Sequence, residues 1–173
     1  MKRHVVLIGL PGSGKTTVGG LVAKHLHVGF VDIDAVIERR EGRPISMIFA
    51  EKGEPVFREM ERKEMETALA SEPAIIAPGG GWAAQPGAVE GVKDRAFVVY
   101  LRTRPDTAAE RAGPEGTRPL LMGGESPVER MRHLIKEREP AYVQAHEKID
   151  TDKRTAAQVA AEVVRLAQTM AGW

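Results

Sequence analysis

The stretch "GLPGSGKTT", from Gly9 to Thr17, constrains the fold of this chain more than any other part of its sequence. It satisfies the pattern Gly-x-x-x-x-Gly-Lys-Thr, and it follows "HVVLIG", a β-branched apolar run typical of a buried parallel strand. After it, apolar residues recur at helical spacing. Backbone N–H groups in such a loop surround phosphate oxygens, and the helix N-terminus favours negative charge. The sequence therefore predicts a phosphate-binding loop (P-loop) between a strand and a helix.

Individual P-loop residues have distinct expected roles toward a nucleotide. Lys15 supplies a mobile cation that follows the charge on a transferred phosphoryl group, and the Thr16 hydroxyl is placed to ligate Mg²⁺. The glycines let the backbone approach the phosphates closely. The nucleotide contacts predicted in this loop are Gly12, Ser13, Gly14, Lys15, Thr16 and Thr17.

Strand and helix patterns alternate along the rest of the chain. Apolar runs in "GFVDID", "AIIA", "AFVVYLR" and "KID" predict strands. Helical patterns fall around 35–40, about 54–70, about 105–111, about 127–145 and 156–170. This alternation predicts an α/β fold, with a parallel sheet covered by helices on both faces and ligands at the carboxyl ends of the strands. A chain of 173 residues fits one such domain.

The stretch "AGPEGTRPLLMGGESP" interrupts the periodicity. It is rich in Gly and Pro, and it is long for a connection without structure of its own, which is typical of a functional or mobile loop. We therefore interpret residues of about 112–124 as a lid. Arg118 lies within it, where it could close onto a bound triphosphate.

Composition excludes several classes of function. The chain has no cysteine, so disulfides, thiolate metal sites and a cysteine nucleophile are excluded. A formal net charge of +1 gives no long-range reason to expect nucleic acid as a partner. No apolar run reaches the roughly 20 residues of a membrane span, and the glycines and lysine of the P-loop interrupt any signal-like segment after "MKRH". We expect a cytoplasmic protein with no membrane partner.

Three other stretches point to the acceptor of the phosphoryl group. Asp32 and Asp34 in "DID" would share one side of an extended strand, where one carboxylate could hold hydrated Mg²⁺ and the other an acceptor hydroxyl. A helix N-cap and a turn are an equally open interpretation of this pair. The glycines of "PGGG", at 79–81, would let a small ligand lie against backbone N–H groups. Arg138 in "KEREPAY" is expected near a helix end at Pro140.

The ordered set "GLPGSGKTT", "FVDIDAVIE", "IFAEKGEPVFREME", "PGGG", "TRPLL", "EREPAY" and "DTDKRT" resembles shikimate kinase over nearly the whole chain. The resemblance implies transfer of the γ-phosphoryl group of ATP to the 3-hydroxyl of shikimate, on the route to chorismate and the aromatic amino acids. It also implies a P-loop kinase fold with a five-stranded parallel sheet, a shikimate-binding subdomain at about 33–61, and a closing lid. The expected partners are shikimate and ATP with Mg²⁺, and a monomer is expected.

The resemblance also implies residue roles. Arg58 and Arg138 would hold the shikimate carboxylate, and Asp34 its hydroxyls, beside the triglycine. The remaining implied shikimate contacts are Gly79, Gly80 and Gly81. Arg118 would be the lid arginine, and Arg111 and Arg154 would lie near the adenine and its phosphates. The implied catalytic residues are Lys15, Asp34 and Arg118, with Thr16 and Asp32 on the metal.

Several alternatives stay open at this stage. A gluconokinase-like carbohydrate kinase or a nucleotide kinase shares the P-loop and lid, although neither is expected to show "FRE" and "GGG" at these spacings. A catalytically silent nucleotide-binding relative would keep the fold without turnover. A GTPase switch is disfavoured, since no Asn/Thr-Lys-x-Asp segment occurs in the chain.

Overall fold

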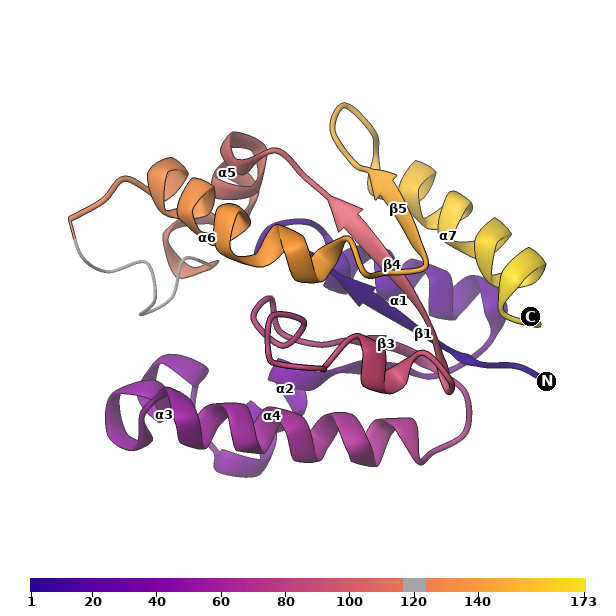
Figure 1. Cartoon of the computed structure of the whole chain (residues 1–173), viewed down its shortest axis with the longest axis horizontal. Coiled ribbons are helices and arrows are strands. Elements are labelled where there is room, and N and C mark those ends of the chain that lie inside the picture. Colours follow the sequence, from indigo (N-terminus) through magenta and orange to yellow (C-terminus); the bar gives the residue numbers. More distant parts are fainter. Residues whose placement is uncertain (117–123) are drawn as a thin grey trace.

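The computed structural model of this protein describes residues 1–116 and 124–173 (Figure 1). Its order of elements alternates strands with helices, as the apolar runs predict. The elements are β1 (His4–Ile8), α1 (Lys15–Leu26), β2 (Phe30–Asp32), α2 (Ile33–Glu41), α3 (Ile45–Lys52), α4 (Glu54–Leu69), β3 (Ile75–Ala77), the short 3₁₀ helix η1 (Glu90–Val92), β4 (Ala96–Arg102), α5 (Pro105–Gly116), α6 (Pro127–Tyr142), β5 (Glu147–Asp150) and α7 (Ala156–Met170). In the described part of the chain, no helix is both long and apolar enough to cross a membrane.

The five strands form one parallel sheet in the order β2-β3-β1-β4-β5. This confirms the expected five-stranded parallel sheet. Strand β1 lies at the centre, paired with β3 on one side and β4 on the other, so its five residues are all buried. A strand covered on both faces needs an uninterrupted apolar run, which "HVVLI" provides after its first residue.

Helices cover both faces of this sheet. Val5 and Leu7 of β1 point into a core shared with α1 and α7, whereas Val6 and Ile8 point into a second core. That second core takes apolar residues from α2, α3, α4, α5 and α6. Helix α1 packs against α7 on the first face, and α5 packs against α6 on the second. The β1–α1 loop therefore emerges at the carboxyl edge of the sheet, between the two layers (Figure 1).

Four local expectations differ from the structure, three at whole helices or helix ends and one at Pro140. Helix α3 was not expected, because its eight residues carry only a weak amphipathic pattern. Helix α5 continues through Pro114 to Gly116, beyond the expected end near Arg111. Helix α6 ends at Tyr142, not near Ala145.

The expected helix end at Pro140 is wrong, because Pro140 lies inside α6. Proline lacks an N–H and costs one helical hydrogen bond, but the helix resumes at once: the Val143 N–H donates to the Glu139 carbonyl at 3.0 Å. Arg138 and Tyr142 therefore lie one turn apart on the same buried face of α6.

Candidate active site

A cavity of about 630 Å³ opens at the carboxyl edge of the sheet. It is lined by the P-loop, by the beginning of α2, by one face of α4, by the segment after β3 and by Arg138 of α6. Every site residue predicted from the sequence lines this single cavity, with the exception of Arg118. Arg118 and most of the predicted lid lie outside the described residues.

The P-loop has the backbone geometry of an anion site. Gly12 and Gly14 have φ angles of 79° and 93°, which a side chain would strain, and a Cβ on Gly12 would lie 2.2 Å from the Ala108 carbonyl oxygen. Gly14 is the N-cap of α1 and offers no capping side chain, and the first turn of α1 has no acidic residue. Its first N–H groups and its dipole therefore favour a bound anion such as a phosphate.

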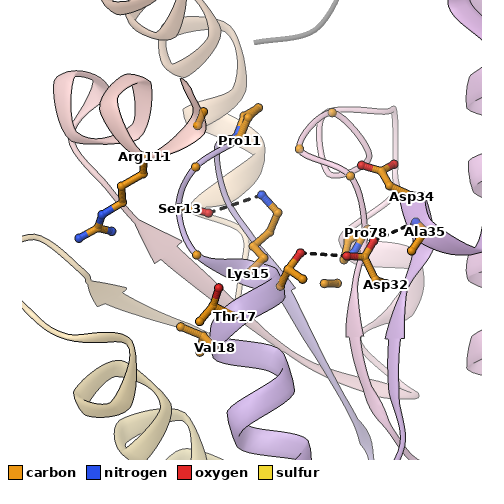
Figure 2. Close-up of a pocket in the computed structure, with 18 of the residues that line it drawn as sticks. Pro11, Ser13, Lys15, Thr17, Val18, Asp32, Asp34, Ala35, Pro78 and Arg111 are labelled. Carbon is orange, nitrogen blue, oxygen red and sulfur yellow. Dashed lines mark hydrogen bonds between the residues drawn. The ribbon is translucent and has the colours of Figure 1, made fainter. Parts of the chain in front are cut away.

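Lys15 is held inside the loop in this structure. Its ammonium donates to the carbonyls of Gly9 and Leu10, at 2.7 and 2.8 Å, and lies 3.5 Å from the Ser13 hydroxyl (Figure 2). These contacts keep the Lys15 ammonium at the P-loop. A phosphate bound in the loop would therefore lie near this cation as well as near the backbone N–H groups.

Thr16 and Asp32 join the P-loop helix to the end of β2. The Thr16 hydroxyl donates to Asp32 Oδ2 at 2.9 Å, while Asp32 Oδ1 accepts from the Ala35 N–H at 3.1 Å (Figure 2). Asp32 is thus the N-cap of α2, which was the alternative interpretation of the "DID" pair, and it lies beside the hydroxyl that was predicted to bind metal. The N-cap interpretation is therefore confirmed for Asp32, and its role at a metal stays a prediction.

Asp34 reaches the cavity by a route that the sequence did not predict. It is not on the strand, which ends at Asp32, but in the first turn of α2. Its carboxylate points toward the segment after Pro78, away from Asp32 (Figure 2). The two aspartates therefore face different parts of the cavity, one beside the P-loop and one beside the triglycine.

Arg58 is fixed by two carboxylates of its own helix. Its guanidinium donates to Glu61 at 2.9 Å and to Glu54 at 3.2 Å. Glu61 is fully buried, and it lines the cavity, although in the sequence it resembles an ordinary charge on a solvated helix. A signal was available: Phe57, Glu61 and Met65 recur at four-residue spacing, which marks the buried stripe of α4.

Arg138 is the second buried arginine of the cavity wall, 7% exposed. Its Nη1 atom has no hydrogen-bond partner among the described residues. A buried guanidinium nitrogen without an acceptor is costly, and an anionic ligand would remove that cost. Arg138 thus provides a positively charged group in the cavity wall beside Gly80.

The three glycines after Pro78 make room for site side chains, one glycine for each neighbour. A Cβ on Gly79 would lie 2.6 Å from Glu61 Oε2, and a Cβ on Gly81 would lie 2.4 Å from Arg58 Nη2. A Cβ on Gly80 would lie 3.1 Å from Arg138 Nη1 and 2.9 Å from Pro11 Cδ. The structure shows that these glycines admit the protein's own side chains, and the ligand contact predicted at 79–81 stays a prediction.

Two further arginines line the cavity. Arg111 of α5 is exposed beside the P-loop (Figure 2). Arg154, before α7, donates to the Asp150 carbonyl at 3.3 Å and pairs with Glu162 at 2.6 Å. Phe49 and Phe57 also line the cavity and were missed in the sequence, because apolar residues there are indistinguishable from core.

Comparison with known proteins agrees with this geometry. The family model described as shikimate kinase matches residues 11–168. A shikimate kinase of Moorella thermoacetica is 43% identical over 163 residues, covering 94% of this chain and 93% of the relative. The solved structure of a shikimate kinase from Acinetobacter baumannii in complex with shikimate superposes with a TM-score of 0.91 at 35% identity, covering 98% of this chain and 94% of that one. A gluconokinase from Sinorhizobium meliloti, 17% identical with a TM-score of 0.65, shares the fold.

Proposed function

Since this chain belongs to the shikimate kinase family and is an ATP-dependent kinase, we propose that its cavity holds ATP at the P-loop and shikimate between α2, α4, the triglycine and α6. The reaction forms a bond between the 3-oxygen of shikimate and the γ-phosphorus, and it breaks the bond from that phosphorus to the bridging oxygen of ADP. The products are shikimate 3-phosphate and ADP, on the route to chorismate and the aromatic amino acids.

One observation supports the acceptor assignment above the others: Arg58 and Arg138, from two different helices, both lie beside the triglycine in the same cavity as the P-loop. Shikimate carries one carboxylate, and guanidinium groups bind a carboxylate in two parallel hydrogen bonds that fix its orientation. Arg58 is partly neutralised by Glu54 and Glu61, while Arg138 Nη1 has no acceptor in the described structure. Together they form the proposed carboxylate clamp.

The remaining roles follow from position in the cavity. Asp34 accepts a hydrogen bond from an acceptor hydroxyl and orients it toward the P-loop, since its carboxylate lies beside Gly79 at the mouth of the clamp. Lys15 exchanges its loop carbonyls for phosphate oxygens and stabilises charge that develops on the transferred group. Arg118 adds a second cation from the lid, and Arg111 and Arg154 contact the nucleotide.

Mg²⁺ fits the oxygen atoms available beside the P-loop. Thr16 Oγ1 and the Asp32 carboxylate lie next to each other, and Mg²⁺ prefers one or two such protein ligands together with phosphate oxygens and water. Among the described residues no group of three or more histidine or acidic side chains could hold a metal by itself, which suits an ion that arrives with its nucleotide. When bound, the ion neutralises charge on the phosphates.

The proposal is tested by measuring ADP release with shikimate, with gluconate, with a nucleoside monophosphate and with no acceptor, each in the presence of Mg²⁺ and after chelation. Turnover that requires both shikimate and Mg²⁺ is expected. A catalytically silent relative would show no acceptor-dependent release, and stimulation by gluconate would instead favour the carbohydrate kinase alternative. A cytoplasmic location and a monomeric state stay predictions, as does the acceptor subdomain at about 33–61.

A further inference from the structure

Tyr142 is buried at the end of α6 and does not line the cavity, yet it contacts the triglycine, which does. We call the triglycine and Arg138 the acceptor wall. The Tyr142 hydroxyl donates to the Gly80 carbonyl at 2.6 Å, across 62 residues of sequence. Burial raises the pKa of the Tyr142 hydroxyl, so this group stays a protonated donor. The contact joins the last turn of α6 to the middle glycine of the triglycine.

Gly80 is therefore held by two side chains of the same helix. The Tyr142 hydroxyl donates to the Gly80 carbonyl oxygen. Arg138 lies one turn earlier, and a Cβ on Gly80 would lie 3.1 Å from its Nη1 atom. Residues four apart on a helix are neighbours on one face. Tyr142 and Arg138 therefore lie beside the same glycine from adjacent turns of α6.

A second tyrosine fixes the ring of Tyr142 in turn. Tyr100 of β4 lies with its ring 5.0 Å from that of Tyr142, and its hydroxyl donates to the Glu139 carboxylate at 2.5 Å. Tyr100 thereby ties α6 to the sheet without contacting the triglycine. Both tyrosines are buried, their rings contact each other, and mutation to phenylalanine would remove one hydroxyl from either. Only Tyr142 is hydrogen-bonded to the triglycine.

We propose that Tyr142 is a positioning residue for the acceptor site: its hydrogen bond to Gly80 sets the spacing between the triglycine backbone and Arg138, and so the geometry in which the shikimate carboxylate is held. The inference rests on the proposed function, in which Gly80 and Arg138 are acceptor contacts. The nucleotide end of the cavity lies on other elements, so Tyr142 is not expected to affect ATP.

The test compares Tyr142→Phe with Tyr100→Phe as its matched control. Loss of one neutral hydrogen bond to the wall is expected to raise KM and Kd for shikimate by roughly three- to tenfold in Tyr142→Phe, with KM for ATP unchanged. Tyr100→Phe is expected to lower the unfolding temperature while leaving both KM values at those of the wild type. Calorimetric titration with shikimate and with ATP separates the two ligands independently of turnover.

Two further variants keep the result interpretable if Tyr142→Phe folds poorly. At position 142, 4-aminophenylalanine retains a donor and is expected to restore affinity for shikimate, whereas the nearly isosteric 4-fluorophenylalanine lacks one and should not. Equal loss of affinity for shikimate and ATP, or no loss in either donor-free variant, would overturn the inference. If the wild-type protein itself shows no shikimate-dependent turnover, the proposed function fails instead, so the two failures are distinguishable.

Discussion

The Thr16 hydroxyl and the Asp32 carboxylate are hydrogen-bonded at 2.9 Å, which joins the first turn of the P-loop helix to the N-cap of the next helix. One carboxylate oxygen of Asp32 serves helix α2 and the other faces Thr16. A structural role and a proposed metal-binding role are therefore divided between two atoms of one side chain. Mutations can separate the roles.

Asp32→Asn should keep most of the stability and lose much of the Mg²⁺ response. Asparagine caps helices about as well as aspartate, whereas Asp32→Ala also loses the cap at a cost of about 1 kcal/mol in the free energy of unfolding. We expect both variants to need more Mg²⁺ for half-maximal turnover, and only the alanine variant to unfold at lower temperature. Ser126→Ala, which removes the N-cap of α6, is the control for cap loss alone. An unchanged Mg²⁺ requirement in Asp32→Asn would remove this residue from the metal site.

Lys15→Ala should reduce kcat by about 10²-fold or more with the fold intact, because its ammonium lies in a loop beside the carbonyls of Gly9 and Leu10 and is proposed to act on developing charge. The measurement is steady-state turnover together with thermal unfolding. Lys24→Ala, at the exposed end of the same helix, is the control and should change neither. Loss of cooperative unfolding in Lys15→Ala would indicate a structural role.

Arg138→Ala and Arg58→Ala should each weaken shikimate binding by about 2 kcal/mol, roughly 30-fold in Kd, and affect ATP far less. They should differ in stability: Arg58→Ala takes a charged donor from the fully buried Glu61 and lowers the unfolding temperature, whereas Arg138→Ala removes a cation whose Nη1 lacks an acceptor in the described structure. Calorimetry with each ligand gives the two affinities of each variant, and thermal unfolding gives its stability. Arg132→Ala, on the exposed side of α6, is the control. Equal losses for both ligands would contradict the clamp.

Arg118→Ala should lower kcat strongly with a smaller change in shikimate affinity, because a lid cation would act mainly on the transition state. Arg118→Lys should restore little, since a point charge cannot reproduce the planar guanidinium. Steady-state kinetics on both variants give the result, and an unchanged kcat in Arg118→Ala would leave the lid as a cover alone. This prediction comes from the sequence, since Arg118 lies outside the described residues.

Stability should fall as the pH drops below about 6.5, in part because of His4. This ring is 4% exposed, accepts from the Ala74 N–H at Nδ1 and contacts the Leu69 carbonyl through Nε2, so it is neutral in the fold. Burial, opposed by these hydrogen bonds and aided by Arg95, lowers the pKa of His4 below its ordinary 6.5. The unfolded chain then binds the extra proton first, so the contribution of His4 is complete above pH 6.5 and is lost as the pH falls toward the folded pKa.

Thermal unfolding from pH 8 to pH 5 measures this effect. His4→Gln should flatten the decline, although not abolish it, because burial also lowers the pKa of His146. His25→Gln, at an exposed position of α1, is the control and should leave the decline as it is in the wild type. A profile equally steep in His4→Gln would assign the acid sensitivity to other groups.

Local sequence patterns predicted most helices and strands, but they could not predict which strands pair or which distant residues contact each other. Buried runs such as "HVVLIG" and the amphipathic stripe of α7 determine their own conformation, and α7 begins at Ala156 as expected. The strand order β2-β3-β1-β4-β5 depends on contacts between distant segments, for which periodicity carries no information; the family resemblance implied the five parallel strands but not their order. Pro140 misled because its lost hydrogen bond is offset by burial of Arg138 and Tyr142 on either side.

The sequence predicted the charged residues and glycines that line the cavity, and it missed residues whose role depends on their burial. Every predicted contact other than Arg118 lines one cavity. Glu61 and Tyr142 had no predicted role, because the sequence does not show that the first is wholly buried and that the second reaches Gly80. Side-chain chemistry is visible in a sequence, but its surroundings are not.

The triglycine has a consequence for changing the acceptor that this enzyme accepts. A Cβ at Gly79 or Gly81 would meet Glu61 or Arg58, and one at Gly80 would meet Pro11 and Arg138, so even alanine would displace a side chain of the site and not merely narrow the cavity. Redesign toward a larger or smaller acid must therefore leave 79–81 alone and vary Phe49 and Phe57, the aromatic part of the wall. In this cavity the aromatic part of the wall can be varied, whereas the triglycine leaves no space for an added side chain.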